Sequence, residues 1–130
     1  MEPQTPKPTN RKVLCIEDEH FISELYVRAL KRVGYEVTVE VDGKRGLDQA
    51  KSDKFDIILL DLMVPTMTGI EVLRELRGPN APPLKAKIII TTNLEQREEI
   101  RADIEKQADA YLVKAEITPR ELVEFLNNVK

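Results

Sequence analysis

Residues 57–65 read IILLDLMVP, four consecutive apolar residues followed directly by Asp61 and then by a loop that contains proline. A run that is apolar at every position, without alternation, is typical of a parallel strand covered on both faces. In open α/β domains, ligands bind beyond the carboxyl ends of such strands. Residues 57–65 therefore predict a buried strand and, at its carboxyl end, a chemically active carboxylate, Asp61.

Four more short apolar runs alternate along the chain with amphipathic stretches. These runs lie at residues 13–16, 37–39, 88–90 and 111–113. Helical spacing of apolar residues appears near residues 21–33, 46–51, 70–76, 94–107 and 118–129. Glu36 and Glu40 flank the second run, which suits an edge strand. Five strand–helix units in about 120 residues predict a doubly wound α/β domain with a parallel sheet and right-handed crossovers.

Several helix ends carry recognisable signals. Gly34 follows the first predicted helix as a C′ residue, and Thr118 with Glu121 predicts an N-cap and capping box for the last one. The fourth predicted helix is rich in charges, and its main large apolar anchors are Ile100 and Ile104. Few anchors imply low local stability, which is typical of an element that moves.

The composition bounds the possible function. The 130 residues are 42% hydrophobic and 33% charged, as expected of one globular domain, predicted at residues 11–130. Residues 1–10 hold three prolines without apolar periodicity and predict a flexible tail. A net charge of −3 leaves no basic stripe for direct nucleic-acid binding. The lack of a signal peptide or an apolar span, with a single cysteine (Cys15), predicts a cytoplasmic domain without a membrane partner.

Acidic residues also follow the first apolar run, as Glu17-Asp18-Glu19. If the first and third strands are neighbours where the strand order reverses, then Glu17, Asp18 and Asp61 converge on one crevice. Three carboxylates at short range repel one another unless a cation lies between them, and a ligand set of oxygens suits Mg²⁺. Glu19 is expected to be only an acid of the first helical turn.

Polar residues end the remaining strands. Thr92 ends the fourth apolar run, and Lys114 ends the fifth. Each alone would be an ordinary strand-end residue, but acids, a hydroxyl and an ammonium at neighbouring strand ends fit phosphoryl transfer, in which a metal and a cation stabilise the moving charge. The Asp61 carboxylate would attack phosphorus in line.

Four segments together resemble the receiver domain of bacterial two-component systems. They are residues 12–19 (KVLCIEDE), residues 61–69 (DLMVPTMTG), Thr92 and residues 111–114 (YLVK). The resemblance covers about residues 11–130 and implies the flavodoxin-like (βα)5 fold with strand order 2-1-3-4-5. It also implies a switch that accepts a phosphoryl group on Asp61 from a sensor histidine kinase or a phosphotransfer protein.

The resemblance assigns roles residue by residue. Asp18 would bind Mg²⁺ directly and Glu17 through water, and the backbone carbonyl of Met63 would join Asp61 as a further ligand. Lys114 would bridge to the phosphoryl group. All of these residue types stand at the matching positions of the sequence.

Further matches concern the switch. Thr92 corresponds to the switch hydroxyl, with the adjacent Thr91 as an alternative, and Tyr111 to the aromatic residue that moves inward. Pro65 and Gly69 correspond to the loop that shapes the acceptor turn. The readout would be the face of the fourth helix, fifth strand and fifth helix, which would bind a downstream protein or a second copy in a phosphorylation-dependent homodimer.

Two positions depart from the family pattern. Ala115 replaces the usual proline after the lysine, and Asn93 replaces a small alanine, which is expected to restrict access to the phosphoryl group. Two positions past the acceptor and past the switch hydroxyl stand the apolar residues Met63 and Leu94, neither of which can orient an attacking water. We therefore expect slow self-dephosphorylation, and no turnover of a free substrate as an enzyme.

Three other classes of protein compete with this interpretation. A pseudo-receiver would bind partners without phosphate, but such domains lack the acceptor, the acid pair or the lysine. A phosphohydrolase of similar fold would need an aspartate where Met63 stands. In a flavin-binding protein the phosphate would meet the acidic loop after residues 13–16, which would repel it.

Overall fold

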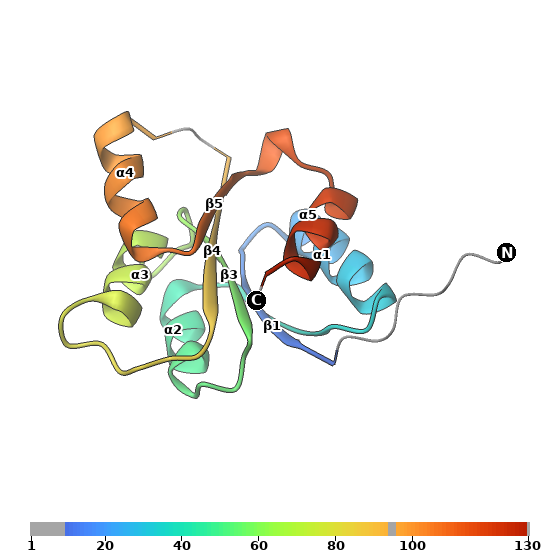
Figure 1. The fold of residues 1–130 in the computed structure, drawn as a ribbon, viewed down its shortest axis with the longest axis horizontal. Coiled ribbons are helices and arrows are strands. Elements are labelled where there is room, and N and C mark those ends of the chain that lie inside the picture. The colour runs from blue at the N-terminus through green and yellow to red at the C-terminus, as the bar shows by residue number, and fades with distance from the viewer. Residues whose placement is uncertain (1–9, 94–95, 130) are drawn as a thin grey trace, which may run out of the picture.

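The structure is a computed structural model that describes residues 10–93 and 96–129. Its centre is a five-stranded parallel sheet (Figure 1). The strands are β1 (Lys12–Ile16), β2 (Glu36–Glu40), β3 (Ile57–Asp61), β4 (Lys87–Thr92) and β5 (Ala110–Val113). Neighbouring strands are parallel throughout, in the order β2-β1-β3-β4-β5. The predicted fold class and strand order are confirmed.

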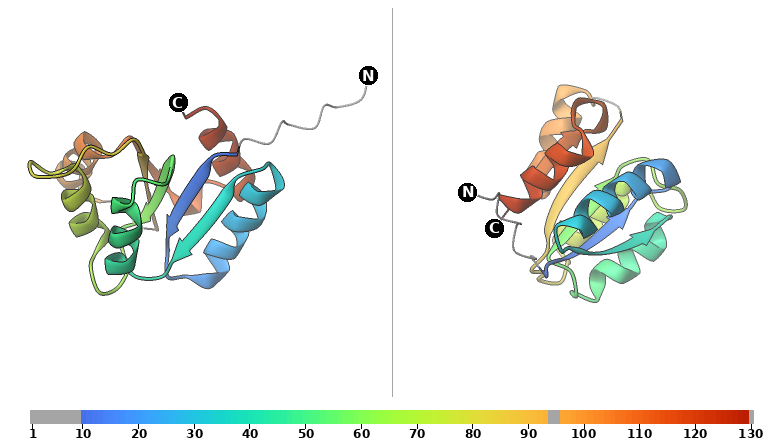
Figure 2. Two further views of the ribbon diagram at one scale, coloured as in Figure 1. Left: turned by 90° about the horizontal axis from the view of Figure 1, so that it is seen from below. Right: turned by 90° about the vertical axis from the view of Figure 1, so that its right-hand side faces the viewer.

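Helices cover both faces of the sheet. They are α1 (His20–Arg32), α2 (Gly43–Lys51), α3 (Gly69–Arg77), α4 (Glu98–Gln107) and α5 (Pro119–Asn127), with a short 3-10 helix η1 (Lys114–Glu116) after β5. Figure 1 shows α2, α3 and α4 on one side of the sheet and α1 and α5 on the other. The views of Figure 2 show β1 beside β2 and α1 beside α5.

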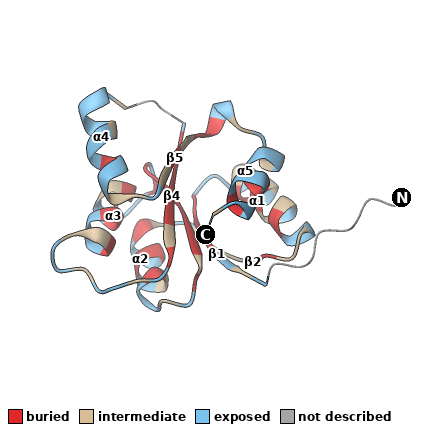
Figure 3. Ribbon diagram, in the orientation of Figure 1, coloured by how far each residue is buried: buried red, intermediate tan, exposed pale blue. Residues whose placement is uncertain are grey.

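Each face of the sheet has its own apolar core. Ile58 and Leu60 of β3 belong to the core under α2, α3 and α4, whereas Ile57 and Leu59 belong to the core under α1 and α5. Because both faces are covered, every residue of β3 is buried, which explains why its sequence does not alternate (Figure 3). The edge strand β2 is only partly buried, as its flanking glutamates predicted.

The predicted helix ends are largely found. Gly34 has a φ of 99°, a left-handed conformation that glycine adopts without steric cost. Thr118 and Glu121 form the predicted capping box of α5. By contrast, α2 begins at Gly43, earlier than its apolar spacing predicted, because the Asp42 side chain accepts a hydrogen bond from the backbone of a residue in its first turn.

One packing prediction in α4 is wrong. Ile104 is buried, but Ile100, predicted as a second anchor, is 42% exposed. The first three residues of α4, residues 98–100, are all exposed (Figure 3), so the Ile100 side chain finds no core to enter. A single buried residue therefore anchors α4.

Some predictions fall on parts of the chain outside the described residues. These are residues 1–9 of the predicted tail, residues 94–95 at the start of the fourth predicted helix (Leu94 among them), and Lys130 at the end of the predicted domain. None of the helices in the described part of the chain has the length and apolar character needed to cross a membrane.

Candidate functional site

The ends of β1 and β3 bring three carboxylates together. Asp61 is the last residue of β3, and Glu17 and Asp18 directly follow its neighbour β1. One carboxylate oxygen from each of the three residues lies within 4.8 Å of the others. Glu17 and Asp61 are buried, whereas Asp18 is exposed. The cluster is therefore an acidic site that opens to solvent beside Asp18.

Lys114 reaches this cluster from the end of β5, the edge strand that β4 separates from β3. It is the first residue of η1, directly after β5, and its side chain is buried. Its Nζ donates hydrogen bonds to Glu17 Oε1 and to Asp61 Oδ2, the latter at 3.0 Å. The contact with Asp61 matches the sequence prediction that Lys114 lies beside the acceptor. The contact with Glu17 was not predicted, because it depends on how far the lysine side chain extends.

Each buried carboxylate also accepts a backbone hydrogen bond. Asp61 Oδ1 accepts from the Met63 N–H at 3.0 Å, and Glu17 Oε2 accepts from the Glu19 N–H at 3.1 Å. With the ammonium on their other oxygens, both groups are paired and hydrogen-bonded, which offsets part of the free-energy cost of burying their charges. These bonds also fix the direction in which each carboxylate points.

The electrostatics of the site follow from this burial. Burial raises the pKa of Glu17 to about 7, with a further increase from Asp61 and an opposing hydrogen bond from Lys114. Burial acts to lower the pKa of Lys114, but its hydrogen bonds with Glu17 and Asp61 outweigh this effect, and the pKa of Lys114 is raised. The ammonium therefore stays charged at neutral pH, and it stands where an incoming anion would need a cation.

The three carboxylates fit a hard divalent cation. Two oxygens bound to one Mg²⁺ at ~2.1 Å lie ~3 Å apart when adjacent and ~4.2 Å apart when opposite. The oxygens of Glu17, Asp18 and Asp61, all within 4.8 Å of one another, approach these separations. Carboxylate oxygens are also the ligands that Mg²⁺ prefers. The donor set and its spacing are thus compatible with Mg²⁺.

The loop after Asp61 is held by close backbone contacts. A Cβ atom at Gly69 would lie 2.3 Å from the Asp61 carbonyl oxygen, so only glycine fits there. The Pro65 carbonyl accepts hydrogen bonds from the backbone N–H groups of Gly43 and Met67, at 3.0 and 2.8 Å. These contacts hold the loop after Asp61 against the first turn of α2.

Thr91 and Thr92 lie on opposite faces of the end of β4. Successive residues of a strand alternate between faces, and Ile90 and Tyr111 both belong to the core under α4. Thr92 therefore shares a face with Tyr111, whereas Thr91 pairs with Asp61 in the register of β3 and β4. Both threonines are buried. This arrangement places Thr92 on the side of the sheet that α4 covers, one of the three elements of the predicted readout face.

Tyr111 connects the sheet to α4. The Arg101 guanidinium carbon lies 4.5 Å from the centroid of the Tyr111 ring, a cation–π contact. Arg101 also forms an ion pair with Glu105, one helical turn further along, at 2.7 Å. A movement of the Tyr111 ring would therefore change its contact with Arg101 and act directly on α4.

Glu19 has a contact that its sequence position did not predict. It is the N-cap residue of α1 rather than an acid within its first turn, and its side chain makes no capping hydrogen bond. Its Oε1 instead accepts a hydrogen bond from Asn93 Nδ2 at 3.0 Å, 74 positions along the chain. The only sequence signal was the unusual asparagine after Thr92.

The comparisons with known proteins agree with this geometry. A sequence profile of the response regulator receiver domain matches residues 13–127. The chain therefore belongs to the response regulator receiver family, whose members serve two-component signalling. The response regulator ArlR of Staphylococcus saprophyticus is 35% identical over 119 residues, which cover 92% of this chain and 50% of that protein. The chain thus spans about half the length of this relative.

Solved structures share the fold. The receiver domain of the Francisella response regulator 1452 has a TM-score of 0.78 and 30% identity, covering 91% of this chain and 94% of that chain. The CheY-like receiver domain protein of Methanospirillum hungatei has a TM-score of 0.75 and 27% identity, covering 92% of each chain. These similarities span nearly the whole βα arrangement.

Proposed function

We propose that this chain accepts a phosphoryl group on Asp61, with Mg²⁺ bound by Glu17, Asp18, Asp61 and the backbone carbonyl of Met63. The donor would be a phosphohistidine of a sensor histidine kinase or a phosphotransfer protein. A carboxylate oxygen of Asp61 bonds to phosphorus as the phosphorus–nitrogen bond breaks, and the released imidazole takes a proton from solvent. When bound, Mg²⁺ supplies positive charge to the phosphoryl oxygens.

The observation that carries this proposal is the position of Lys114. Its buried ammonium touches the acceptor Asp61, so a phosphoryl group that arrives on Asp61 meets a fixed positive charge. Such a preorganised cation costs no reorganisation when the negative charge arrives. The hydrogen bond from Met63 N–H fixes the same carboxylate, which favours attack in one direction.

The signal would pass through a two-state equilibrium. A phosphoryl group on Asp61 gains contacts with Thr92 and Lys114 in one state only, and this difference shifts the population. Tyr111 then moves with Thr92 and alters α4, which it contacts through Arg101. The readout is the α4–β5–α5 face, supported by the weak anchoring of α4.

Exposed apolar side chains close in sequence to the site residues support a protein partner. Phe21, in the first turn of α1, and Met63, after Asp61, are large, apolar and exposed. Apolar side chains at a site rim are typical of a protein-binding surface.

We propose residues 11–130 as the receiver domain and residues 1–10 as a tail. The domain would act in the cytoplasm, where the partner kinase would deliver the phosphoryl group. A downstream protein, or a second copy, would bind the switched face.

Phosphorylation with a small donor tests the proposal. The wild-type chain, incubated with acetyl phosphate and Mg²⁺, should gain one phosphoryl group by intact mass, and Asp61→Asn should gain none. Omission of Mg²⁺ should abolish the gain. Equal labelling of wild type and Asp61→Asn would show that the acceptor is wrong, and partner binding without any labelling would identify a pseudo-receiver.

A further inference from the structure

The hydrogen bond between Asn93 and Glu19 spans the strand that carries the acceptor. Glu19 belongs to the loop after β1, and Asn93 to the loop after β4. In the strand order, β3 lies between β1 and β4, so these two strands are two spacings, ~10 Å, apart. The bond from Asn93 Nδ2 to Glu19 Oε1 therefore joins the two sides of the site across the end of β3, where Asp61 lies.

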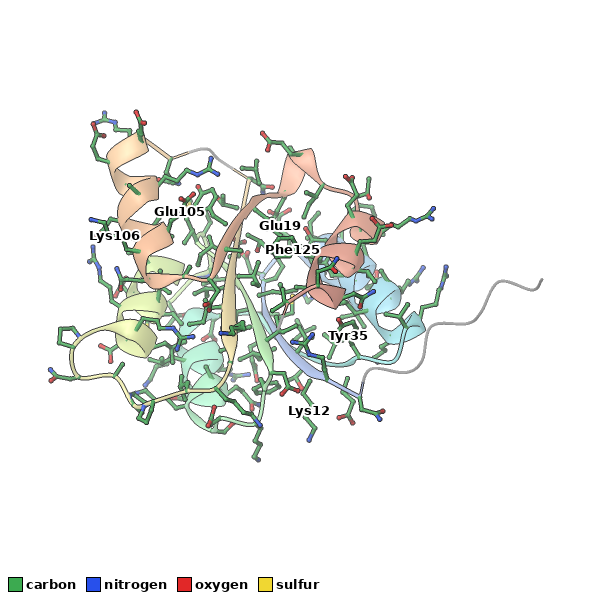
Figure 4. All side chains as sticks on the ribbon, in the orientation of Figure 1. Lys12, Glu19, Tyr35, Glu105, Lys106 and Phe125 are labelled. Atoms are coloured by element: carbon green, nitrogen blue, oxygen red, sulfur yellow. The ribbon has the colours of Figure 1, made fainter. Side chains whose placement is uncertain are left out.

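Both ends of this bridge stand on fixed parts of the fold. The Glu19 backbone N–H donates to Glu17, which is buried in the acidic cluster. Asn93 directly follows Thr92, a fully buried residue at the end of β4. The two bridging side chains themselves are exposed, so the bond lies at the surface of the site and not in its core. Glu19 is labelled in Figure 4.

We propose that the Glu19–Asn93 bridge is a strap that limits the access of small phosphodonors and of water to Asp61. The proposal rests on the function proposed above, with Asp61 as acceptor. Glu19 and Asn93 are specificity-determining residues here and bind neither the metal nor the phosphoryl group. An exposed hydrogen bond of this kind favours its closed state only ~2- to 10-fold, so the strap slows entry without preventing it.

The same strap acts on two reactions. In labelling by acetyl phosphate, an Asp61 oxygen bonds to phosphorus as the bond to the acetate oxygen breaks and acetate leaves. In the decay of phosphoryl-Asp61, a water oxygen bonds to phosphorus, the bond to Asp61 breaks, and the water proton goes to solvent. Both incoming molecules must reach the end of β3, so opening the strap accelerates both reactions.

The variants separate the bridge from the bulk of Asn93 and from the charge of Glu19. Asn93→Ala and Glu19→Ala each remove the bond. Glu19→Gln removes the charge but keeps an oxygen that accepts from Asn93 Nδ2. The double variant Glu19→Ala/Asn93→Ala shows whether the two residues act as one unit.

The measurement is the initial rate of labelling of the full chain by acetyl phosphate with Mg²⁺, and the decay rate after the donor is removed, both by intact mass. Asn93→Ala and Glu19→Ala should each raise both rates ~2- to 10-fold. The double variant should be no faster than either single variant, and Glu19→Gln should match wild type.

Three results would overturn the strap while leaving the proposed function intact. They are unchanged rates in both alanine variants, single effects that multiply in the double variant, and a Glu19→Gln variant as fast as Glu19→Ala. The last would assign the effect to charge rather than to the bridge. A wild-type chain that gains no phosphoryl group would overturn the proposed function, and the strap with it.

Discussion

Lys114 Nζ lies 3.0 Å from Asp61 Oδ2, and each of these side chains is only 3% exposed. The pair joins the ends of β5 and β3, which β4 separates in the sheet. Because water is excluded, the attraction between the two charges is weakly screened. The same ammonium also pairs with Glu17, so one lysine is shared by two buried acids.

Removal of this lysine should destabilise the fold. Lys114→Met leaves Glu17 and Asp61 buried without a counter-charge, and breaking a buried ion pair in this way costs about 3 kcal/mol. Urea unfolding at neutral pH, in a buffer with a chelator, measures the loss. Asp61→Asn, which removes one of two repelling acids, is the control. It should lower the free energy of unfolding clearly less than Lys114→Met does. Equal stability of Lys114→Met and wild type would contradict a structural role for the buried ammonium.

Magnesium should stabilise the chain through the same carboxylates. A ligand that binds only the folded state at a hundred times its dissociation constant adds about 2.7 kcal/mol to the free energy of unfolding. We expect MgCl₂ to raise the melting temperature of wild type, and to raise it much less in Asp18→Asn and Asp61→Asn. NaCl at equal ionic strength is the control. A shift that persists in both variants would place the metal elsewhere.

Substitution of each threonine should identify the switch hydroxyl. Thr92 shares a face with Tyr111, so Thr92→Val should still accept the phosphoryl group but lose the response of the α4–β5–α5 face. Thr91→Val, its matched control on the opposite face of β4, should keep that response. Amide NMR spectra recorded with and without beryllofluoride, a stable phosphoryl mimic, measure the response of this face. The reverse pattern would assign the switch to Thr91.

The Cys15 thiol should be inert in the folded chain. Burial raises the pKa of Cys15 to about 12, with further increases from the acids nearby and an opposing effect of Lys114. At pH 8 the thiolate is then ~10⁻⁴ of the total, against roughly a quarter for a free cysteine. Reaction with a thiol reagent should be very slow in buffer and fast in urea. Rapid labelling in buffer would mean that β1 opens locally.

The sequence predicted the strands well because their evidence is local. The run at residues 57–60 is apolar at every position since both faces of β3 are covered, and the chemical residues stand where strands end. The order of the strands was not local information. The sequence of residues 13–16 does not indicate that β1 lies beside β3. The expected strand order came from the family resemblance.

The contacts of the site that the sequence did not predict depend on how far side chains extend and on how loops approach one another. The Nζ atom of Lys114 contacts Glu17 as well as Asp61, and the spacing of residues in the sequence does not show which carboxylates a long side chain reaches. The bond between Glu19 and Asn93 exists because two loops approach across β3. Ile100 has the helical spacing of an anchor, but it lies in a turn that has no core beneath it. In each case, tertiary geometry decided what a local pattern left open.

The lifetime of phosphoryl-Asp61 should be long, and the residue at position 63 should control it. Met63, two residues after Asp61, is 62% exposed, and its thioether accepts hydrogen bonds too weakly to orient an attacking water.

Met63→Asn places an amide there, which can hold a water for attack on phosphorus, so this variant should lose its phosphoryl group faster. Met63→Leu, apolar and of similar size, is the matched control and should decay like wild type. The decay is followed by intact mass after the donor is removed. A wild-type lifetime of seconds would contradict the prediction, because the water would then be oriented without help from this side chain.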